Sequence, residues 1–270
     1  MISLSNRDEN RIVFSHTPMY TVSEEKVLEF SLDTYRLDFI VQGRGKCVLE
    51  GREYCLTSGC VIITKPFEYR FVQIPDNASF DCYTVKFSIE DLSDSTVELL
   101  ESIIGDRRGF CFTGKAYDAI LSTFERSHSA NLLPGQHADP YYRSLLAEIV
   151  CLLSIAREVH DVTDESSLGF RVIKYVNEYL TRDLTLEFLS KKFFVSKYYM
   201  CRAFKKHNGI SVHGYMVHKR VMLAKQLIER GAAATAAAKT VGFRDYSAFY
   251  RAFIKIIGQS PLLIRTKGEV

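Results

Sequence analysis

The sequence predicts an α+β protein with two domains: a β-barrel or β-sandwich with flanking helices, followed by an all-helical domain with two helix-turn-helix motifs. Three observations lead to this prediction. Short β-rich runs separated by glycine turns lie in the first part of the chain, an apolar helical stripe follows them, and the C-terminal part contains an internal repeat. A length of 270 residues is enough for two separate hydrophobic cores.

The β-rich part covers residues 30–88. Its expected strands are 34–41, 46–49, 53–57, 60–64, 67–71 and 80–88, with glycines in the turns between them. In 67–71 the aromatic side chains alternate with Glu68 and Arg70, which is the period of two that half-buried strands show. Strands at this spacing, separated by glycine turns, are typical of a sandwich or a barrel.

Residues 91–160 are predicted to be mostly helical. The clearest helix is 141–159, where apolar residues recur at steps of four and three: Leu145, Ile149, Leu152, Ala156 and Val159. Such a stripe packs on the barrel, pairs with a second copy of the chain, or does both. We expect a homodimer through it, because an exposed stripe of this kind is an aggregation risk. The polar stretch 161–167 is the expected linker between domains at 1–160 and 168–270.

The charge distribution changes sign at this linker. Residues 1–166 contain 16 Lys and Arg against 26 Asp and Glu, a net charge of −10. Residues 167–270 contain 19 against 6, a net charge of +13. This asymmetry predicts that the second half alone contacts a polyanion such as nucleic acid. A solvated basic surface without a partner is the alternative.

The basic half contains a duplicated segment. The tripeptide Arg-Ala-Phe occurs at 202–204 and again at 251–253, and a glycine follows each copy at the same distance, at Gly209 and Gly258. Duplication predicts two copies of one supersecondary unit. The pattern of each copy indicates two short helices joined by a tight turn, which is a helix-turn-helix.

Capping residues define the helices of these units. Thr185 and Ser196 are expected to start the two helices of the first unit, and Asp245 the second helix of the other unit, Tyr246–Ile257. Glycine ends each second helix. Between the units, Ser211 is expected to start a long helix that continues to Arg230.

The second helix of each unit is amphipathic, and its polar face is the predicted DNA contact. A major groove admits one α-helix, in which arginine can bind guanine and lysine can neutralise phosphate. The candidate contacts in the first unit are Tyr198, Cys201, Arg202, Lys205 and Lys206. Those in the second unit are Tyr246, Ser247, Tyr250, Arg251 and Lys255.

These motifs resemble the AraC/XylS family of bacterial transcription regulators. The strongest stretch is Val-Gly-Phe-Arg-Asp at 241–245, continuing to Gly-Gln-Ser-Pro at 258–261. Tyr215, Arg220, Ala224 and Leu227 match the family's linker helix. The N-terminal half is similar to the family's cupin-like ligand barrel, around 43–45, 50–54 and Gly59.

The resemblance implies a sequence-specific DNA-binding regulator, expected to be an activator, whose barrel binds a small-molecule effector such as a sugar. Its implied partners are double-stranded DNA, the effector, a second copy of the chain and RNA polymerase. Residues expected to line the effector pocket, with core packing as the alternative, are Arg36, Phe39, Tyr69 and Tyr83.

One segment departs from the family pattern. The helix before the 241–245 motif usually begins with Ser or Thr and packs with Ile, but alanines stand at Ala233, Ala234 and Ala237. Alanine keeps the helix propensity but removes the cap and much of the buried surface. We expect a weakened second unit, unless Thr235 moves the cap by two residues.

Other function classes lack the motifs that they need. The segment 30–88 contains no histidine, so the ligand cluster of a metalloenzyme is missing there. Neither a phosphate-binding loop nor a G-x-S-x-G elbow occurs. We therefore expect no catalytic residue, no metal and no cofactor. Two alternatives stay open: a regulator controlled by a protein partner, and a metal-independent cupin enzyme joined to a DNA-binding domain.

The expected compartment is the cytoplasm. The seven cysteines occur singly, without a C-x-x-C pair, which favours a reducing environment over a disulfide framework. No secretory signal and no apolar run of about 18 residues is visible in the sequence, so we expect no membrane span.

Overall fold

The computed structural model describes residues 2–3, 12–21, 25–31, 33–105, 107–133 and 135–265. The chain divides into two compact units, residues 1–163 and 164–270. The division lies inside the polar stretch 161–167.

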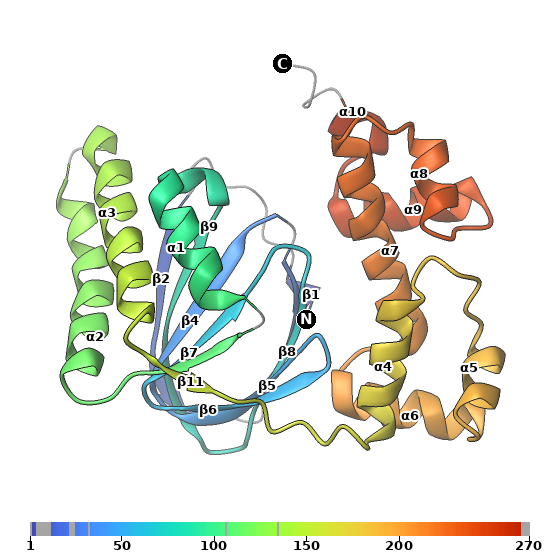
Figure 1. Cartoon of the computed structure of the whole chain (residues 1–270), viewed down its shortest axis with the longest axis horizontal. Helices are drawn as coiled ribbons and strands as arrows, with labels where there is room; N and C mark the ends of the chain where they lie inside the picture. Colours follow the sequence, from blue (N-terminus) through green and yellow to red (C-terminus); the bar gives the residue numbers. More distant parts are fainter. Residues whose placement is uncertain are drawn as a thin grey trace. The chain divides into compact units, whose positions relative to one another are not determined.

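Within its described residues, the first unit contains two β-sheets and three α-helices (Figure 1). One sheet has the strand order β1 (Ile2–Ser3), β3 (Glu25–Phe30), β8 (Tyr69–Ile74), β5 (Arg44–Leu49) and β6 (Arg52–Thr57). The other has the order β11 (Arg157–Val159), β10 (Gly109–Cys111), β7 (Cys60–Thr64), β4 (Tyr35–Gln42), β9 (Ser79–Phe87) and β2 (Val13–Thr21). Neighbouring strands are antiparallel except for β1 and β3. The predicted α+β class is confirmed.

The six predicted strands are present, but the sheet region begins earlier than residue 30. Strands β1, β2 and most of β3 precede the predicted region, and β10 and β11 follow it. Pro18 argues against a strand at β2, because proline has no N–H to donate to a neighbouring strand. The structure places it at a register shift between Thr17 and Tyr20, in an edge strand, where proline is tolerated. Phe67, predicted to be in a strand, lies in the turn before β8 with a φ of +64°.

The six-stranded sheet is buried on both faces. On β4, Leu37 and Phe39 belong to the core on one face, whereas Arg36, Asp38 and Ile40 line a cavity on the other. Opposite faces follow from the period of two along a strand. The sheet therefore has a layer of helices on one side and the cavity on the other.

The helical layer consists of α1 (Asp94–Ile104), α2 (Lys115–Ser127) and α3 (Gly135–Leu153), with the short 3₁₀ helices η1 (Ile89–Asp91) and η2 (His128–Leu132). Helix α3 packs against both α1 and α2. Phe124 of α2 stacks on Phe39 of the sheet, with ring centroids 5.5 Å apart. This layer closes the outer face of the six-stranded sheet.

The apolar stripe predicted as a dimer interface is used inside the chain. Leu145 and Ile149 are buried, and Leu152 packs against the core under the helices. The helix ends at Leu153, so Ala156 lies beyond it and packs on that core too, while Val159 belongs to β11. The structure therefore shows the expected packing on the chain's own sheet, and it leaves Leu145 and Ile149 unavailable to a second copy. Leu152, Ala156 and Val159 stay partly exposed, so pairing through them stays a prediction.

The second unit is helical, with α4 (Leu168–Glu178), α5 (Leu186–Lys192), α6 (Lys197–Asn208), α7 (Val212–Glu229), α8 (Ala234–Thr240), α9 (Tyr246–Ile257) and α10 (Pro261–Arg265). The pairs α5–α6 and α8–α9 are the two helix-turn-helix motifs, and α7 joins them (Figure 1). No helix in the described ranges is both long enough and apolar enough for a membrane span.

The predicted caps of this unit are confirmed. Thr185, Ser196 and Ser211 each accept a hydrogen bond from a backbone N–H in the first turn of the following helix. Asp245 accepts two such bonds at the start of α9. Gly209 and Gly258 end the second helices with left-handed backbone, the conformation that favours glycine there.

The alanine-rich segment forms α8 without a side-chain cap. Ala233 is the N-cap residue and accepts no side-chain hydrogen bond. The suggestion that Thr235 moves the cap is wrong, since Thr235 lies within the first turn of α8. Ala237 and Ala238 are buried, so small side chains fill this part of the packing.

We expect Ala233→Ser to stabilise the second unit by about 1 kcal/mol, because a serine hydroxyl at this N-cap accepts a backbone N–H that now has no side-chain partner. Ala233 is exposed and extended, as a capping residue must be. Denaturant unfolding of both proteins measures the difference. Ala236→Ser, also exposed but inside the helix, is the control and is expected to give no stabilisation. Equal effects at both positions would contradict the capping argument.

Candidate functional site

A cavity of about 230 Å³ lies between the two sheets of the first unit. Side chains from β2 to β9 line it, so both sheets contribute: Thr17, Val27, Glu29, Arg36, Asp38, Ile40, Cys47, Leu56, Ile62, Arg70, Val72, Ile74, Phe80, Cys82 and Thr84. The volume exceeds by far the space that one water molecule needs. It is sufficient for a small organic molecule.

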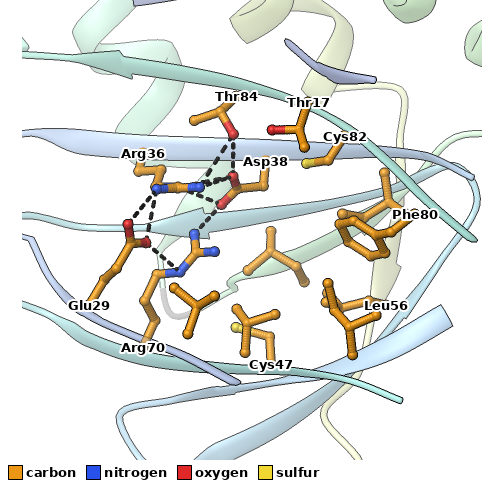
Figure 2. Close-up of a pocket in the computed structure, with 15 residues that line it drawn as sticks. Thr17, Glu29, Arg36, Asp38, Cys47, Leu56, Arg70, Phe80, Cys82 and Thr84 are labelled. Atoms are coloured by element: carbon orange, nitrogen blue, oxygen red, sulfur yellow. Dashed lines mark hydrogen bonds and ion pairs between the residues drawn. The ribbon is translucent and has the colours of Figure 1, made fainter. Parts of the chain in front are cut away.

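A network of four charged side chains forms one end of the cavity, with Asp38 at its centre (Figure 2). Arg36 Nε donates to both carboxylate oxygens of Asp38 at 2.9 Å. Thr84 Oγ1 donates to Asp38 Oδ1 at 2.6 Å, and Arg70 Nη1 donates to Asp38 Oδ2. Burial raises the pKa of Asp38, but the guanidinium groups of Arg36 and Arg70 outweigh it and hold this pKa well below its usual range.

Glu29 completes the network from the other sheet. Arg36 Nη1 donates to its two carboxylate oxygens at 3.1 and 2.9 Å, and Arg70 Nε lies 3.3 Å from Oε2. The two guanidinium groups therefore bridge two carboxylates, and the four charges balance. Taking four charges out of water is costly, and the hydrogen bonds within the network offset part of this cost.

Two cationic groups at this end keep donors that the network does not use. Figure 2 shows the second terminal nitrogen of Arg70 on the side facing the apolar part of the cavity, without a partner among the residues drawn. Lys86 lines a small neighbouring pocket that shares Glu29, Arg36 and Arg70 with the cavity. Burial and the nearby Arg36 guanidinium lower the pKa of Lys86.

The remainder of the cavity is apolar. Ile40, Leu56 and Phe80 are among the side chains that face it. Burial raises the pKa of the Cys47 thiol to about 11 and raises that of Cys82 as well, so both cysteines are neutral and unreactive at physiological pH. The cavity thus has one charged end and one apolar end.

Of the four residues predicted to line a pocket, only Arg36 lines this cavity. Phe39 and Tyr83 point to the opposite face of their sheet and stack on Phe124. Tyr69 packs against Phe30, with ring centroids 5.2 Å apart. The assignment of these three aromatic residues to the cavity is wrong, because they occupy core positions, which was the stated alternative.

Four other residues of the charged end were not predicted: Glu29, Asp38, Arg70 and Lys86. A signal for them exists in the sequence, since charged side chains recur at every second position of otherwise apolar strands, as at Arg36 and Asp38. Read alone, that alternation indicates a solvent-facing side. The five-stranded sheet covers this face, so its charged residues line an interior cavity and not the solvent-exposed surface.

Helix α6 presents its predicted DNA contacts on one side. Four of the five side chains are exposed and one is half-buried: Tyr198, Arg202, Lys205 and Lys206 are exposed, and Cys201 is half-buried. Tyr198 is 75% exposed, whereas Met200 and Phe204 on the opposite side have no exposure. The helix therefore offers a polar, basic face and is held by an apolar one.

Helix α9 repeats this arrangement. All five predicted side chains are exposed: Tyr246, Ser247, Tyr250, Arg251 and Lys255. Phe249 and Phe253 on the opposite side have no exposure. The turns before the two helices differ, because Gly242 has a φ of +90° in the second motif and Phe194 has one of +55° in the first. The side chain of Phe194 is 95% exposed, and its role was not predicted.

Arg220 of α7 connects the two helix-turn-helix motifs. Its guanidinium donates to the carbonyl oxygens of Leu180 at 2.9 Å and Arg182 at 2.7 Å, in the loop before α5. It also donates to the carbonyl of Gly242 at 3.0 Å, in the turn before α9. Arg244 and Asp183 form a further ion pair between these segments. One side chain thus binds the backbone that leads into the first motif and the turn of the second.

No group of three or more His, Cys, Asp and Glu side chains in the described ranges is arranged to hold a metal ion.

Two family models match the chain. That of an AraC-like ligand-binding domain matches residues 31–169, about half of the chain, and that of a helix-turn-helix domain matches residues 189–267. The first model spans the strands that line the cavity from β4 to β9, and the second contains both α6 and α9.

Two curated relatives are described as transcriptional regulators. The chain is 32% identical over 145 residues to the probable transcriptional regulator LumQ of Photobacterium leiognathi, a match over 53% of this chain and 56% of that protein. It is 24% identical over 217 residues to the uncharacterized HTH-type transcriptional regulator YbfI of Bacillus subtilis, over 80% of this chain and 78% of that one. The solved structure of ToxT from Vibrio cholerae matches with 14% identity and a TM-score of 0.37, over 95% of this chain and 98% of that one. The chain belongs to the AraC/XylS family of DNA-binding transcription regulators.

Proposed function

We propose that this protein regulates transcription by binding double-stranded DNA through α6 and α9, under the control of a small-molecule effector in the cavity between its two sheets. The observation that supports this most is the presence of two capped, basic, exposed helices in one unit, each held by a buried, mostly apolar face. We assign no enzymatic activity, metal or cofactor to it. Residues 1–160 would sense the effector, 161–167 would be the linker and 168–270 would bind DNA.

Other parts of the proposal rest on family resemblance. These are an activating role in the cytoplasm, a homodimeric state and contact with RNA polymerase. A homodimer needs a surface other than the stripe at Leu145 and Ile149, because these side chains are buried within the chain.

DNA selection followed by footprinting tests the DNA-binding part. The full chain is incubated with random duplexes, the bound sequences are recovered, and the selected site is footprinted. We expect two major-groove contacts per monomer about 10–10.5 base pairs apart, one helical turn, because the unit presents two recognition helices. A single short contact would show that the motif containing α8 does not engage DNA.

Arg202→Ala and Arg251→Ala should each weaken binding to the selected site by about 1–3 kcal/mol, because each removes an exposed guanidinium able to bind guanine. Titrations at several salt concentrations measure the affinities. Lys206→Ala is the control: it should weaken all sequences alike and flatten the salt dependence, as expected for a phosphate contact. Unchanged affinity of Arg202→Ala for the selected site would remove α6 as a recognition helix.

A further inference from the structure

The charges that face the polar end of the cavity do not balance once Lys86 is included. Among the residues that line the cavity and its small neighbouring pocket, Arg36, Arg70 and Lys86 are basic and Glu29 and Asp38 are acidic. Lys86 is directly opposite Arg36 in the β4–β9 ladder, where like charges repel. The polar end therefore has a net charge of +1.

The two carboxylates are engaged by Arg36, Arg70 and Thr84 and not by Lys86. Both oxygens of Asp38 accept from Arg36, and Thr84 and Arg70 add one bond each. Glu29 accepts from Arg36 through both oxygens and lies against Arg70. No ion pair or hydrogen bond joins the Lys86 ammonium to another described residue. Lys86 is half-buried, and a bound anion would stabilise its charge beside the two guanidinium groups.

The rest of the cavity wall limits the chemistry of the part of the ligand that lies beyond its anionic group. Thr17 and Thr84 are the neutral side chains with hydroxyl groups that line the larger cavity, and Thr84 already donates to Asp38. Ser31, Thr34 and Thr64 line only the small neighbouring pocket, beside Lys86. A sugar needs neutral donors and acceptors around its ring, because each buried hydroxyl without a partner is costly. Aliphatic side chains, two thiols and Phe80 form the remaining wall. This surface fits hydrocarbon rather than a polyol.

We propose that the effector is a small amphipathic monoanion, with a carboxylate-type head at Arg70 and Arg36 and an apolar body against Ile40, Leu56 and Phe80. The inference rests on the proposed role of the cavity as the effector site, and it names the class of ligand. The free terminal nitrogen of Arg70 donates to the head, and Lys86 supplies the positive charge that the head neutralises. The volume of about 230 Å³ restricts the body to a short chain or a single ring.

Calorimetric titration of the full chain with matched pairs tests the class. The acids are hexanoate, octanoate and benzoate, and the neutral partners are hexanamide, octanamide and benzamide, with arabinose as a sugar probe. We expect at least one acid to bind tenfold or more tightly than its amide, and arabinose not to bind. The pairs match in apolar body, so the comparison isolates the charge of the head.

Lys86→Met separates this charge from the shape of the cavity, because Lys86 lies outside the wall of the larger cavity. The variant should bind the best acid about tenfold more weakly and bind its amide unchanged, and Lys86→Arg should restore binding. Lys115→Met, which removes an exposed cation at the start of α2, is the control and should leave acid binding as it is.

Three results would overturn the class: amides that bind as tightly as acids, acids that bind Lys86→Met as tightly as the parent, and no binding by any acid. The role of the cavity is judged separately with Cys82→Phe, which fills it from β9. Binding of an amide or of arabinose that is lost in Cys82→Phe would keep the cavity as effector site and reject only the anion. Acid binding that survives in Cys82→Phe would place the ligand elsewhere and reject both.

Discussion

Asp38→Ala is expected to lower the free energy of unfolding of the first unit by about 3–5 kcal/mol. The substitution leaves the guanidinium groups of Arg36 and Arg70 buried without their central counter-charge, and breaking a buried pair from one side has this cost. The side chain of Asp38 is 5% exposed, so water cannot replace the lost partner. Denaturant unfolding followed by circular dichroism measures the change, since the chain contains no tryptophan.

An exposed ion pair provides the control. Glu148 pairs with Arg126 at 2.6 Å, but both side chains are more than 40% exposed. Glu148→Ala should therefore cost no more than about 1 kcal/mol. Equal losses for Asp38→Ala and Glu148→Ala would contradict the argument that burial decides the size of the effect.

The same carboxylate should appear in the pH dependence of stability. The pKa of Asp38 is lowered in the folded state. Its contribution to the free energy of unfolding is therefore fully present above about pH 4, the pKa in the unfolded chain, and is lost as the pH falls toward the pKa in the folded state. The parent should lose more stability than Asp38→Asn between about pH 4 and pH 2. Parallel curves for the two proteins would contradict the lowered pKa.

Arg220→Met should weaken binding to the selected DNA site by about 100-fold or more. Methionine keeps the aliphatic packing of the side chain but removes the hydrogen bonds to Leu180, Arg182 and Gly242. The two recognition helices then lose a shared anchor, and most of the gain from linking two binding modules is lost with their relative geometry. Quantitative DNA titration measures the affinity.

Arg230→Met is the matched control, because it removes an exposed positive charge at the end of the same helix. It should change DNA affinity only slightly. The footprint distinguishes the causes further: Arg220→Met should retain one groove contact and lose the regular spacing of the second. A normal footprint with two contacts would show that α7 alone holds the helices in place.

Local signals explain why the DNA-binding unit was predicted closely. Helix α9 has the predicted bounds, and Ser196 and Asp245 are the predicted caps. A cap needs only a side chain and backbone two or three residues away, so the sequence alone specifies it. Helix α4 was not predicted as a separate element, and Thr235 proved not to be the cap of α8.

The first unit was harder to predict because its six-stranded sheet is buried on both faces. Strand β4 alternates charged and apolar residues, as a strand with one solvent-exposed face does: Arg36 and Asp38 are charged, and Leu37 and Phe39 are apolar. For the same reason the stripe at Ile149 looked free for a second subunit, although it covers the outer face of the chain's own sheet.

The sequence by itself determined the two helix-turn-helix units, the strands from residue 35 to residue 87 and the change of charge between the halves, because periodicity, caps and composition act over a few residues. Only the tertiary structure decided the cavity between the sheets. Its charged end draws Glu29 from β3, Asp38 from β4, Arg70 from β8 and Lys86 from β9, and these side chains meet only when the two sheets face each other. The net positive charge thus comes from residues on strands that are distant in the chain, and no local sequence pattern predicts it.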